Sequence, residues 1–257
     1  MIKVNFIGRL GNNMIQYTIA RFLCENKGYD LTCENIGHTS SSQMFDLFPK
    51  TKDNIVGKSF LHNRLIVGYD GVNNHIQEYD INLLLNHNGY IELKGFFQKH
   101  DLFFDYKDLI ESYFQYDNSN LKTSIEYDVV IHLRLTDYIE LNHFIHPEKI
   151  YNLYKELNFS KALIITDDPN NKLLDCFRND IYCNIEKNST LQDIHYMTTS
   201  KNIIISQSTF SWWGSYLGNQ KTIYVPYTNQ NYPWPYNPMF NDIDLIPNNK
   251  NYIKIKI

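Results

Sequence analysis

Polar side chains follow three apolar segments of this sequence, at the point where each segment ends. The apolar segments 129–131, 162–165 and 203–205 are typical of buried strands. In open α/β sheets, ligands bind outside the carboxyl ends of the strands, so we expect these polar groups to share one crevice. The residues that follow the three segments are His132, Arg134 and Asp137; Thr166, Asp167 and Asp168; and Ser206, Gln207, Ser208 and Thr209.

The types of these residues suit a nucleotide diphosphate. Arg134 offers a planar fork of donors that matches phosphate oxygens, and each such charge-assisted bond contributes about 1.5–3 kcal/mol. Ser208 and Thr209 would begin a helix, where hydroxyl groups, unpaired amides and the helix dipole favour phosphate. Asp167 and Asp168 suit base amino groups or ribose hydroxyls. Two plainer interpretations stay open, because Asp168 also fits a turn and helix cap, and Ser208 also fits a cap alone.

Two other kinds of site fit the sequence less well. His132, His143 and His146 could suggest a metal centre, but their spacing matches no standard motif on one helix. The loop Gly8–Gly11 lacks the G-K-[ST] of a P-loop and the full G-x-G-x-x-G of a dinucleotide site. The sequence therefore predicts no metal, and it supports neither an ATPase nor a dehydrogenase.

The elements that must position these residues are strands that alternate with helices. This alternation predicts a parallel sheet covered on both faces. Ser189 with Gln192 forms a capping box for one helix, and Gly218 provides a stop for another. The predicted strands are 129–133, 162–165, 202–205 and 222–225, with a weaker one at 182–185, and the predicted helices are 147–157, 171–177, 191–198 and 210–217.

The N-terminal part begins with another strand, glycine loop and helix. Residues 2–7 predict the strand, 8–13 the loop, and apolar residues at helical spacing run from Met14 to Gly28. No secure pattern emerges from residues 34–90. The segments predicted beyond them are a strand at 91–95 and a helix at 102–114.

Length and composition bound the class of protein. A chain of 257 residues fits one large domain or two small ones, and the polar stretch 118–123 predicts a boundary between units 1–122 and 123–257. The net charge of −4 argues against a general nucleic-acid binder. No signal peptide and no apolar run long enough to span a bilayer are evident, so a cytoplasmic protein is expected. The four cysteines, in no zinc pattern, are expected to be reduced.

Four segments of the chain, in order, resemble the α-1,2-fucosyltransferase family, glycosyltransferase family 11. Together with the TDD at 166–168 they span positions 8 to 217. The segments are GRLGNNMIQY at 8–17, similar to G-G-L-G-N-Q-M-F-Q-Y; LKGFFQKHDLF at 93–103, similar to L-x-G-Y-x-Q-x-x-x-Y-F; HLRLTDY at 132–138, similar to H-x-R-R-G-D-Y; and QSTFSWWGSYL at 207–217, similar to S-S-F-S-W-W-G-A-x-L.

The resemblance implies an α/β fold of GT-B-like type, in which two Rossmann-like halves with parallel sheets face a shared cleft. It also implies a GDP-fucose donor, inversion at the fucose carbon, no metal, and a glycan acceptor such as the 2-OH of a terminal galactose. A lipid-linked acceptor would bring the enzyme into peripheral contact with a membrane. The N-terminal half would face the acceptor, and the C-terminal half would bind the nucleotide sugar.

The same resemblance assigns roles to individual residues. Arg134 would bind the donor diphosphate, and Asp137 is our candidate for the general base, with a structural pairing to Arg134 as the alternative. The remaining assignments are His132 with Asp167 or Asp168 to the guanine or ribose, Ser208, Thr209 and Phe210 to the nucleotide pocket, and Gly11 and Asn12 to the catalytic cleft.

Three departures from the family pattern bear on these assignments. Leu135 stands where the family has a second arginine, Thr136 replaces a glycine, and Asn13 replaces a glutamine. Loss of one cation leaves Arg134 to offset the charge of the leaving group. Two alternatives therefore stay open, namely transfer of a different sugar from a different nucleotide, and a non-catalytic protein that binds nucleotides or glycans.

Overall fold

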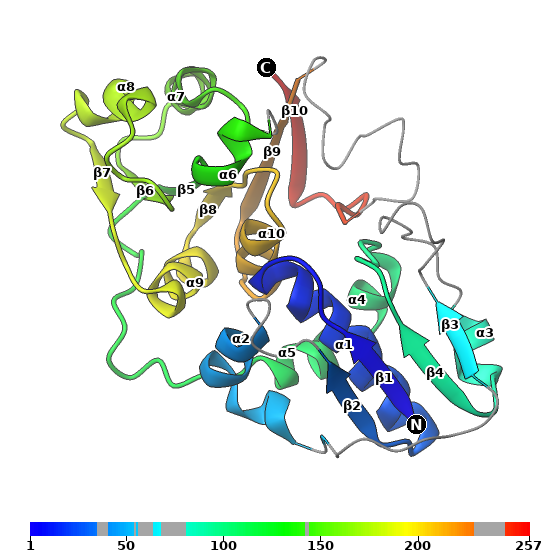
Figure 1. The fold of residues 1–257 in the computed structure, drawn as a ribbon. Coiled ribbons are helices and arrows are strands. Elements are labelled where there is room, and N and C mark those ends of the chain that lie inside the picture. The colour runs from blue at the N-terminus through cyan, green and yellow to red at the C-terminus, as the bar shows by residue number, and fades with distance from the viewer. Residues whose placement is uncertain (35–40, 54, 56–63, 68–80, 142–143, 229–244) are drawn as a thin grey trace. The chain divides into compact units, whose positions relative to one another are not determined.

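Each of the two units of the chain is built on its own parallel sheet (Figure 1). The first unit comprises Met1–Asp117 with Asp242–Leu245, and the second comprises Asn118–Asn241 with Ile246–Ile257. The computed structural model describes residues 1–34, 41–53, 55, 64–67, 81–141, 144–228 and 245–257.

The first unit holds a four-stranded sheet in the order β2-β1-β4-β3. Its strands are β1 (Ile2–Asn5), β2 (Leu31–Glu34), β3 (Arg64–Val67) and β4 (Tyr90–Leu93). Its helices are α1 (Leu10–Lys27), α2 (Ser41–Leu47), α3 (Ile81–Asn86), α4 (Asp101–Asp105) and α5 (Lys107–Tyr113), with a short 3-10 helix, η1 (Pro49–Lys52).

Helix α1 begins earlier than the sequence predicts. The expected loop 8–13 is wrong from Leu10 onward, because α1 starts at that residue. The side-chain amide of Asn13 donates to the carbonyl of Ile7 at 2.9 Å, so this asparagine fastens the helix start to the end of the strand instead of forming a loop. The predicted end is confirmed, since Gly28 adopts a φ of 63° and its N–H bonds to the carbonyl of Cys24.

The predicted helix 102–114 is two helices. The chain breaks between α4 and α5 at Tyr106, whose φ of −124° and ψ of 35° are not helical. The ring of Tyr106 lies 4.5 Å from that of Phe22 on α1. This contact across the unit accompanies the break, and helical periodicity alone does not reveal it.

The second unit holds a six-stranded parallel sheet in the order β10-β9-β8-β5-β6-β7. Its strands are β5 (Val129–Leu133), β6 (Ala162–Thr166), β7 (Cys183–Glu186), β8 (Asn202–Ile204), β9 (Thr222–Tyr227) and β10 (Tyr252–Lys256). Its helices are α6 (Thr136–Glu140), α7 (Pro147–Glu156), α8 (Asp175–Arg178), α9 (Thr190–Thr199) and α10 (Thr209–Tyr216), with a 3-10 helix, η2 (Lys172–Leu174).

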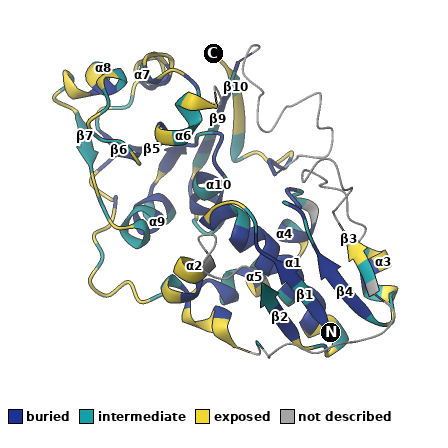
Figure 2. Ribbon diagram, viewed as in Figure 1, coloured by how far each residue is buried: buried dark blue, intermediate teal, exposed yellow. Residues whose placement is uncertain are grey.

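The centre of this sheet is covered on both faces. Strands β5 and β6 are buried along their whole length (Figure 2), as expected for parallel strands between helices. One face of the sheet contributes to a hydrophobic cluster with α7, which includes Ile150, Leu153 and Tyr154. Helices α9 and α10 pack closely together, because a Cβ added at Gly214 of α10 would lie 2.6 Å from the Cβ of Met197 on α9.

Most elements of this unit follow the sequence prediction. The predicted strand 129–133 is confirmed residue for residue, and the hydroxyl of Ser189 caps α9 by accepting from the amide of Gln192. The predicted helix 171–177 is wrong, because Asn171 caps the 3-10 helix η2 before the short α8 begins. Strand β10, at the edge of the sheet, was not predicted, although its residues alternate between isoleucine and lysine from Ile253 to Lys256.

None of the helices in the described part of the chain combines the length and apolar character needed to cross a membrane.

Candidate active site

The candidate site lies at the carboxyl edge of the six-stranded sheet. Strands β8, β5 and β6 are neighbours in this sheet and run parallel, so the residues that follow them meet at one edge. Arg134 comes directly after β5, Asp167 after β6, and the turn Ser206–Ser208 after β8. The structure thus brings together the three polar groups that the sequence analysis expected to share a crevice.

Arg134 is held by an acid and an aromatic ring from the next turn of the chain. Its Nε donates to Oδ1 of Asp137 at 2.9 Å, and its Nη2 donates to Oδ2 at 2.7 Å. Its Cζ lies 4.5 Å from the ring centre of Tyr138, a cation–π contact. The other three N–H donors of the guanidinium have no hydrogen-bond partner among the described residues. A doubly anchored arginine with donors to spare is well suited to bind an anion.

The electrostatics keep Arg134 charged. Burial would lower the pKa of the guanidinium, but the hydrogen bonds to Asp137 and the nearby charges of Tyr138, Asp137 and Asp167 raise it above its ordinary value. The side chain of Arg134 is 13% exposed, so its field is only partly screened by water.

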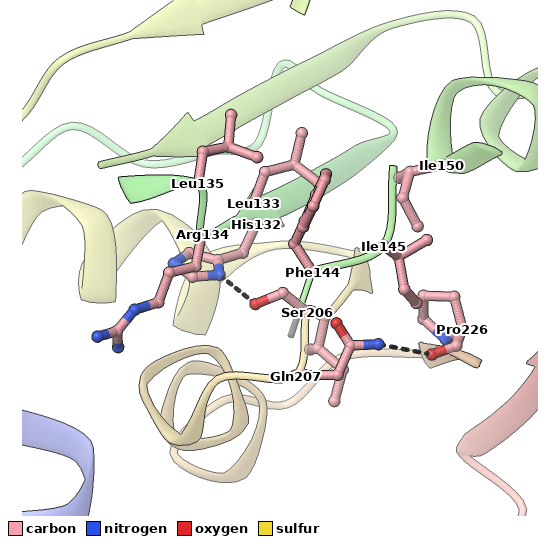
Figure 3. Close-up of a pocket in the computed structure, with 11 residues that line it drawn as sticks. His132, Leu133, Arg134, Leu135, Phe144, Ile145, Ile150, Ser206, Gln207 and Pro226 are labelled. Atoms are coloured by element: carbon pink, nitrogen blue, oxygen red, sulfur yellow. Dashed lines mark hydrogen bonds between the residues drawn. The ribbon is translucent and has the colours of Figure 1, made fainter. Parts of the chain in front are cut away.

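His132 lies on β5, two positions before Arg134, and is uncharged at neutral pH. Burial lowers the pKa of its imidazole to about 4. The positive charge of Arg134 also lowers this pKa, whereas the negative charge of Asp167 raises it. Its Nδ1 lies 2.8 Å from the hydroxyl of Ser206 (Figure 3), and its ring lies 5.6 Å from that of Phe210. A neutral imidazole can offer a ligand either a donor or an acceptor, according to its tautomer.

Helix α10 begins at this same edge with a capped start. Ser208 is fully buried, and its hydroxyl accepts from the amide of Phe210 at 3.3 Å. The first bond of the helical ladder runs from the amide of Trp212 to the carbonyl of Ser208, so amides of the first turn precede the ladder. Thr209 and Phe210 are half-buried at this helix tip. Ser208 therefore caps the helix, its assignment to the nucleotide pocket stays a prediction, and the helix dipole is directed at the edge.

The two aspartates after β6 have structural contacts of their own. Asp167 accepts from the amide of Leu135 at 2.8 Å and from the hydroxyl of Thr136 at 2.5 Å, which fixes the chain on either side of α6's start. Asp168 accepts from the side-chain amide of Asn171 at 2.9 Å, as its turn interpretation requires. The assignment of either aspartate to guanine or ribose stays a prediction, whereas their hold on the site's backbone is a feature of the structure.

Leu135, which replaces the family's second arginine, belongs to the core. It is 1% exposed and joins a hydrophobic cluster with Ile145 and Ile150. Figure 3 shows its side chain and that of Arg134 extending in different directions. All three apolar residues also line a small pocket of about 10 Å³, whose polar members include Ser206 and Arg134.

Two residues at this edge were not predicted from the sequence to belong to the site. Tyr138, which stacks on Arg134, also donates its hydroxyl to the carbonyl of Gln207 at 3.0 Å. Asp193 lies in the first turn of α9, after β7, and accepts from the side-chain amide of Asn188 at 3.1 Å. Burial, with a smaller effect from Glu186, raises the pKa of Asp193 to about 7. In the sequence, Asp193 is indistinguishable from an ordinary first-turn acid of a helix.

Gly11 and Asn12, predicted to line the cleft, lie in the first turn of α1 in the first unit. Oδ1 of Asn12 accepts from the side-chain amide of Gln98 at 2.9 Å. Gly8 has a φ of +77°, which favours glycine, and a Cβ there would lie 2.6 Å from the side-chain nitrogen Nδ2 of Asn12. Their contribution to a cleft shared with the second unit stays a prediction.

The histidines weighed as metal ligands have other roles where the structure describes them. His146 caps α7, with its Nδ1 accepting from the amide of Glu148 at 3.3 Å, and His132 bonds to Ser206. His143 lies outside the described residues. Across the described ranges, no group of three or more histidine, cysteine or acidic side chains is arranged to hold a metal ion.

Comparison with known proteins shows the family of this chain. A sequence model of glycosyl transferase family 11 matches residues 1–240. No curated protein matches the sequence.

Several solved structures share the fold. NodZ alpha-1,6-fucosyltransferase co-crystallised with GDP has a TM-score of 0.55 at 12% identity, over 86% of this chain and 93% of its own. Fucosyltransferase NodZ from Bradyrhizobium has a TM-score of 0.54 at 11% identity, over 86% and 94%. A mutant of Arabidopsis thaliana FUT1 in complex with GDP has a TM-score of 0.50 at 11% identity, over 91% and 72%. These similarities confirm the predicted fold class, an α/β fold of GT-B type with two parallel sheets.

Proposed function

Since this chain belongs to glycosyl transferase family 11, we propose that it transfers L-fucose from GDP-fucose to a hydroxyl group of a glycan, with inversion at the fucose carbon and without a metal ion. The observation that carries the proposal is the anchored Arg134 near the start of α10, with three N–H donors that have no hydrogen-bond partner in the described part of the chain. The GDP complexes of the structurally similar fucosyltransferases support this choice of donor.

In the proposed reaction, the departing GDP must be stabilised as its negative charge develops. Arg134 and the first-turn amides of α10 supply preorganised donors for the diphosphate, which is the most effective form of electrostatic catalysis in a cleft. His132 stays neutral beside them, so it adds a hydrogen bond without altering the charge of the site.

The proton of the acceptor hydroxyl needs a destination, and Asp137 is a poor one. Both of its carboxylate oxygens accept from the guanidinium of Arg134, so each is already engaged by a donor. We therefore assign Asp137 to the orientation of Arg134, in place of the general-base role expected from the sequence. A fucosyl transition state with oxocarbenium character makes the departure of GDP the demanding event, so no strong base is needed and the acceptor proton can pass to solvent water as the new C–O bond forms.

Asp193 is our candidate for recognition of the base. Guanine presents adjacent N1–H and N2–H donors, which one carboxylate can accept together, whereas uracil presents a single N–H donor. Asp193 lies in the first turn of the helix that follows β7, on the same sheet edge as Arg134, and is largely shielded from water. Among the described side chains, Asn188 donates a hydrogen bond to it. Two donors from a guanine would supply the pairing that a buried carboxylate lacks.

For the acceptor we propose the 2-OH of a terminal galactose, as the motif resemblance implies. NodZ is an alpha-1,6-fucosyltransferase, so the linkage must be measured on this protein. Leu135 favours one second candidate, a different nucleotide sugar, because the site has one arginine where the family pattern has two.

A donor screen tests the proposal. Calorimetry with GDP and UDP, followed by GDP release from GDP-fucose and GDP-mannose and UDP release from UDP-galactose with a panel of galactosides, should show GDP binding and turnover of GDP-fucose alone. Turnover of a UDP-sugar would establish the second candidate. GDP binding without turnover of any donor would identify a non-catalytic binding protein and reject the proposed reaction.

A further inference from the structure

Tyr138 is in contact with both elements that the proposed function assigns to the diphosphate. Its ring faces the guanidinium of Arg134 at 4.5 Å. Its hydroxyl donates to the main-chain carbonyl of Gln207 at 3.0 Å, and Gln207 is the residue before Ser208, the cap of α10. One side chain therefore joins the arginine after β5 to the helix start after β8.

Both ends of this connection are fixed by other bonds. Tyr138 lies on α6, whose start is held by Asp167 through the amide of Leu135 and the hydroxyl of Thr136. Gln207 is buried, and its side-chain amide donates to the carbonyl of Pro226 on β9 (Figure 3). A rigid aromatic side chain between two fixed segments defines the distance between them.

We propose that Tyr138 is a positioning residue that sets the distance between the Arg134 guanidinium and the first-turn amides of α10. The inference rests on the proposed function, because that distance matters only if both groups bind one diphosphate. Tyr138 itself acts through Arg134 and the Gln207 carbonyl and contributes no group to the reacting atoms.

The test separates positioning from general support by a double-mutant cycle. Tyr138→Phe keeps the ring over Arg134 and removes only the hydroxyl bond to Gln207. GDP affinity is measured by calorimetry for the wild type, Tyr138→Phe, Arg134→Ala and the double variant, with a competition format for weak binders. The expected loss on Tyr138→Phe is about fivefold in the wild type, the effect of one hydrogen bond. In the Arg134→Ala background the expected loss is below about twofold, since the arginine to be positioned is absent.

A matched control comes from the same unit. Tyr151 on α7 has the same two kinds of contact, a hydroxyl bond to Asp180 at 3.1 Å and Lys155 5.8 Å from its ring. Tyr151→Phe should leave GDP affinity unchanged. Tyr138→Leu, which removes the ring as well, should weaken GDP binding further than Tyr138→Phe, and melting temperatures of all variants show whether each is folded.

The outcomes are distinct. An equal loss in both backgrounds would mean that Tyr138 supports the fold independently of Arg134, and it would overturn the proposal, as would unchanged GDP affinity in Tyr138→Phe. Absence of GDP binding by the wild type would instead remove the proposed function, and this inference with it. A loss confined to the background that contains Arg134 would establish the positioning role.

Discussion

Replacement of Arg134 by alanine is the most direct perturbation of the proposed site. Beyond the pair with Asp137, three guanidinium N–H donors have no partner among the residues that the structure describes, and two of these suffice for a bidentate contact with a phosphate. Each charge-assisted bond contributes about 1.5–3 kcal/mol, so the variant should lose about 3–6 kcal/mol of transition-state stabilisation. At about 1.4 kcal/mol per decade, this is a loss of about 10²–10⁴ in kcat/KM.

Part of the measured loss would come from the acid left behind. Without the guanidinium, Asp137 would be a partly buried carboxylate, 28% exposed, that repels the diphosphate. The double variant Arg134→Ala with Asp137→Asn removes that charge. Its recovery relative to Arg134→Ala measures the repulsion, and its remaining deficit measures the contacts of the guanidinium itself.

The assay is initial-rate release of GDP from GDP-fucose, alongside thermal unfolding of each variant. Arg21→Ala is the matched control, because Arg21 pairs with Glu25, lies 5.6 Å from the ring of Tyr113, and is 12% exposed, close to the 13% of Arg134. It should lower the melting temperature without a change in kcat/KM. Retention of kcat/KM within about threefold in Arg134→Ala, or an equal loss in Arg21→Ala, would refute the phosphate assignment.

Three further predictions concern the acid, the base and the metal. Asp137→Asn should lower kcat about tenfold with an unchanged pH profile if the residue orients Arg134, whereas a general base would cost 10²–10⁴-fold and the profile would lose its acid limb. Asp193 must be ionised to accept two guanine donors, and burial raises its pKa to about 7. Calorimetric GDP affinity should therefore fall as the pH drops from 8 to 6, by more than protonation of the GDP phosphate alone produces. Asp193→Asn should bind more weakly and keep only the part of the pH dependence that is due to the phosphate; a dependence as steep in the variant as in the wild type would contradict this. Transfer should continue in excess chelator, and a loss restored by added metal would reject the metal-free scheme.

The location of the site was predictable because parallel strands simplify the problem. Strands β5 and β6 are buried on both faces and therefore appear in the sequence as continuous apolar runs. The polar residues that end such runs must fall on one edge if the strands are parallel. Arg134 and Ser208 were found in this way, without knowledge of the sheet order.

The internal geometry of the site was not predictable, because it depends on contacts between distant residues. Asp167 accepts hydrogen bonds from Leu135 and Thr136 at the start of α6, which lie 32 and 31 positions earlier in the chain. These contacts help to orient the Asp137 and Tyr138 that follow. A sequence pattern shows that an acid and an aromatic residue follow an arginine. Whether the acid faces the arginine or the acceptor depends on where the helix begins, which Asp167 helps to fix.

Burial explains why Asp193 was not predicted from the sequence. The chemistry of Asp193 comes from its partial removal from water, which is produced by the packing of α9 and has no local signature. Elsewhere in the chain, first-turn acids such as Asp108 on α5 and Glu148 on α7 occupy the same kind of helical position. Only the fold distinguishes the acid that is desolvated at the sheet edge from those that favour a helix dipole.

In the proposed reaction, Leu135 in place of a second arginine makes the site more dependent on Arg134 than the family pattern suggests. Leu135 is part of the apolar cluster with Ile145 and Ile150, so this position supports the end of β5 from within the core. Under the proposed function, offset of the leaving group's charge would fall to the Arg134 guanidinium and to the neutral donors at the tip of α10, with His132 uncharged beside them. Neutral donors respond less strongly to developing charge than a cation does. The energetic demand is therefore concentrated on Arg134, and with it on Asp137 and Tyr138, the two residues that hold it in place.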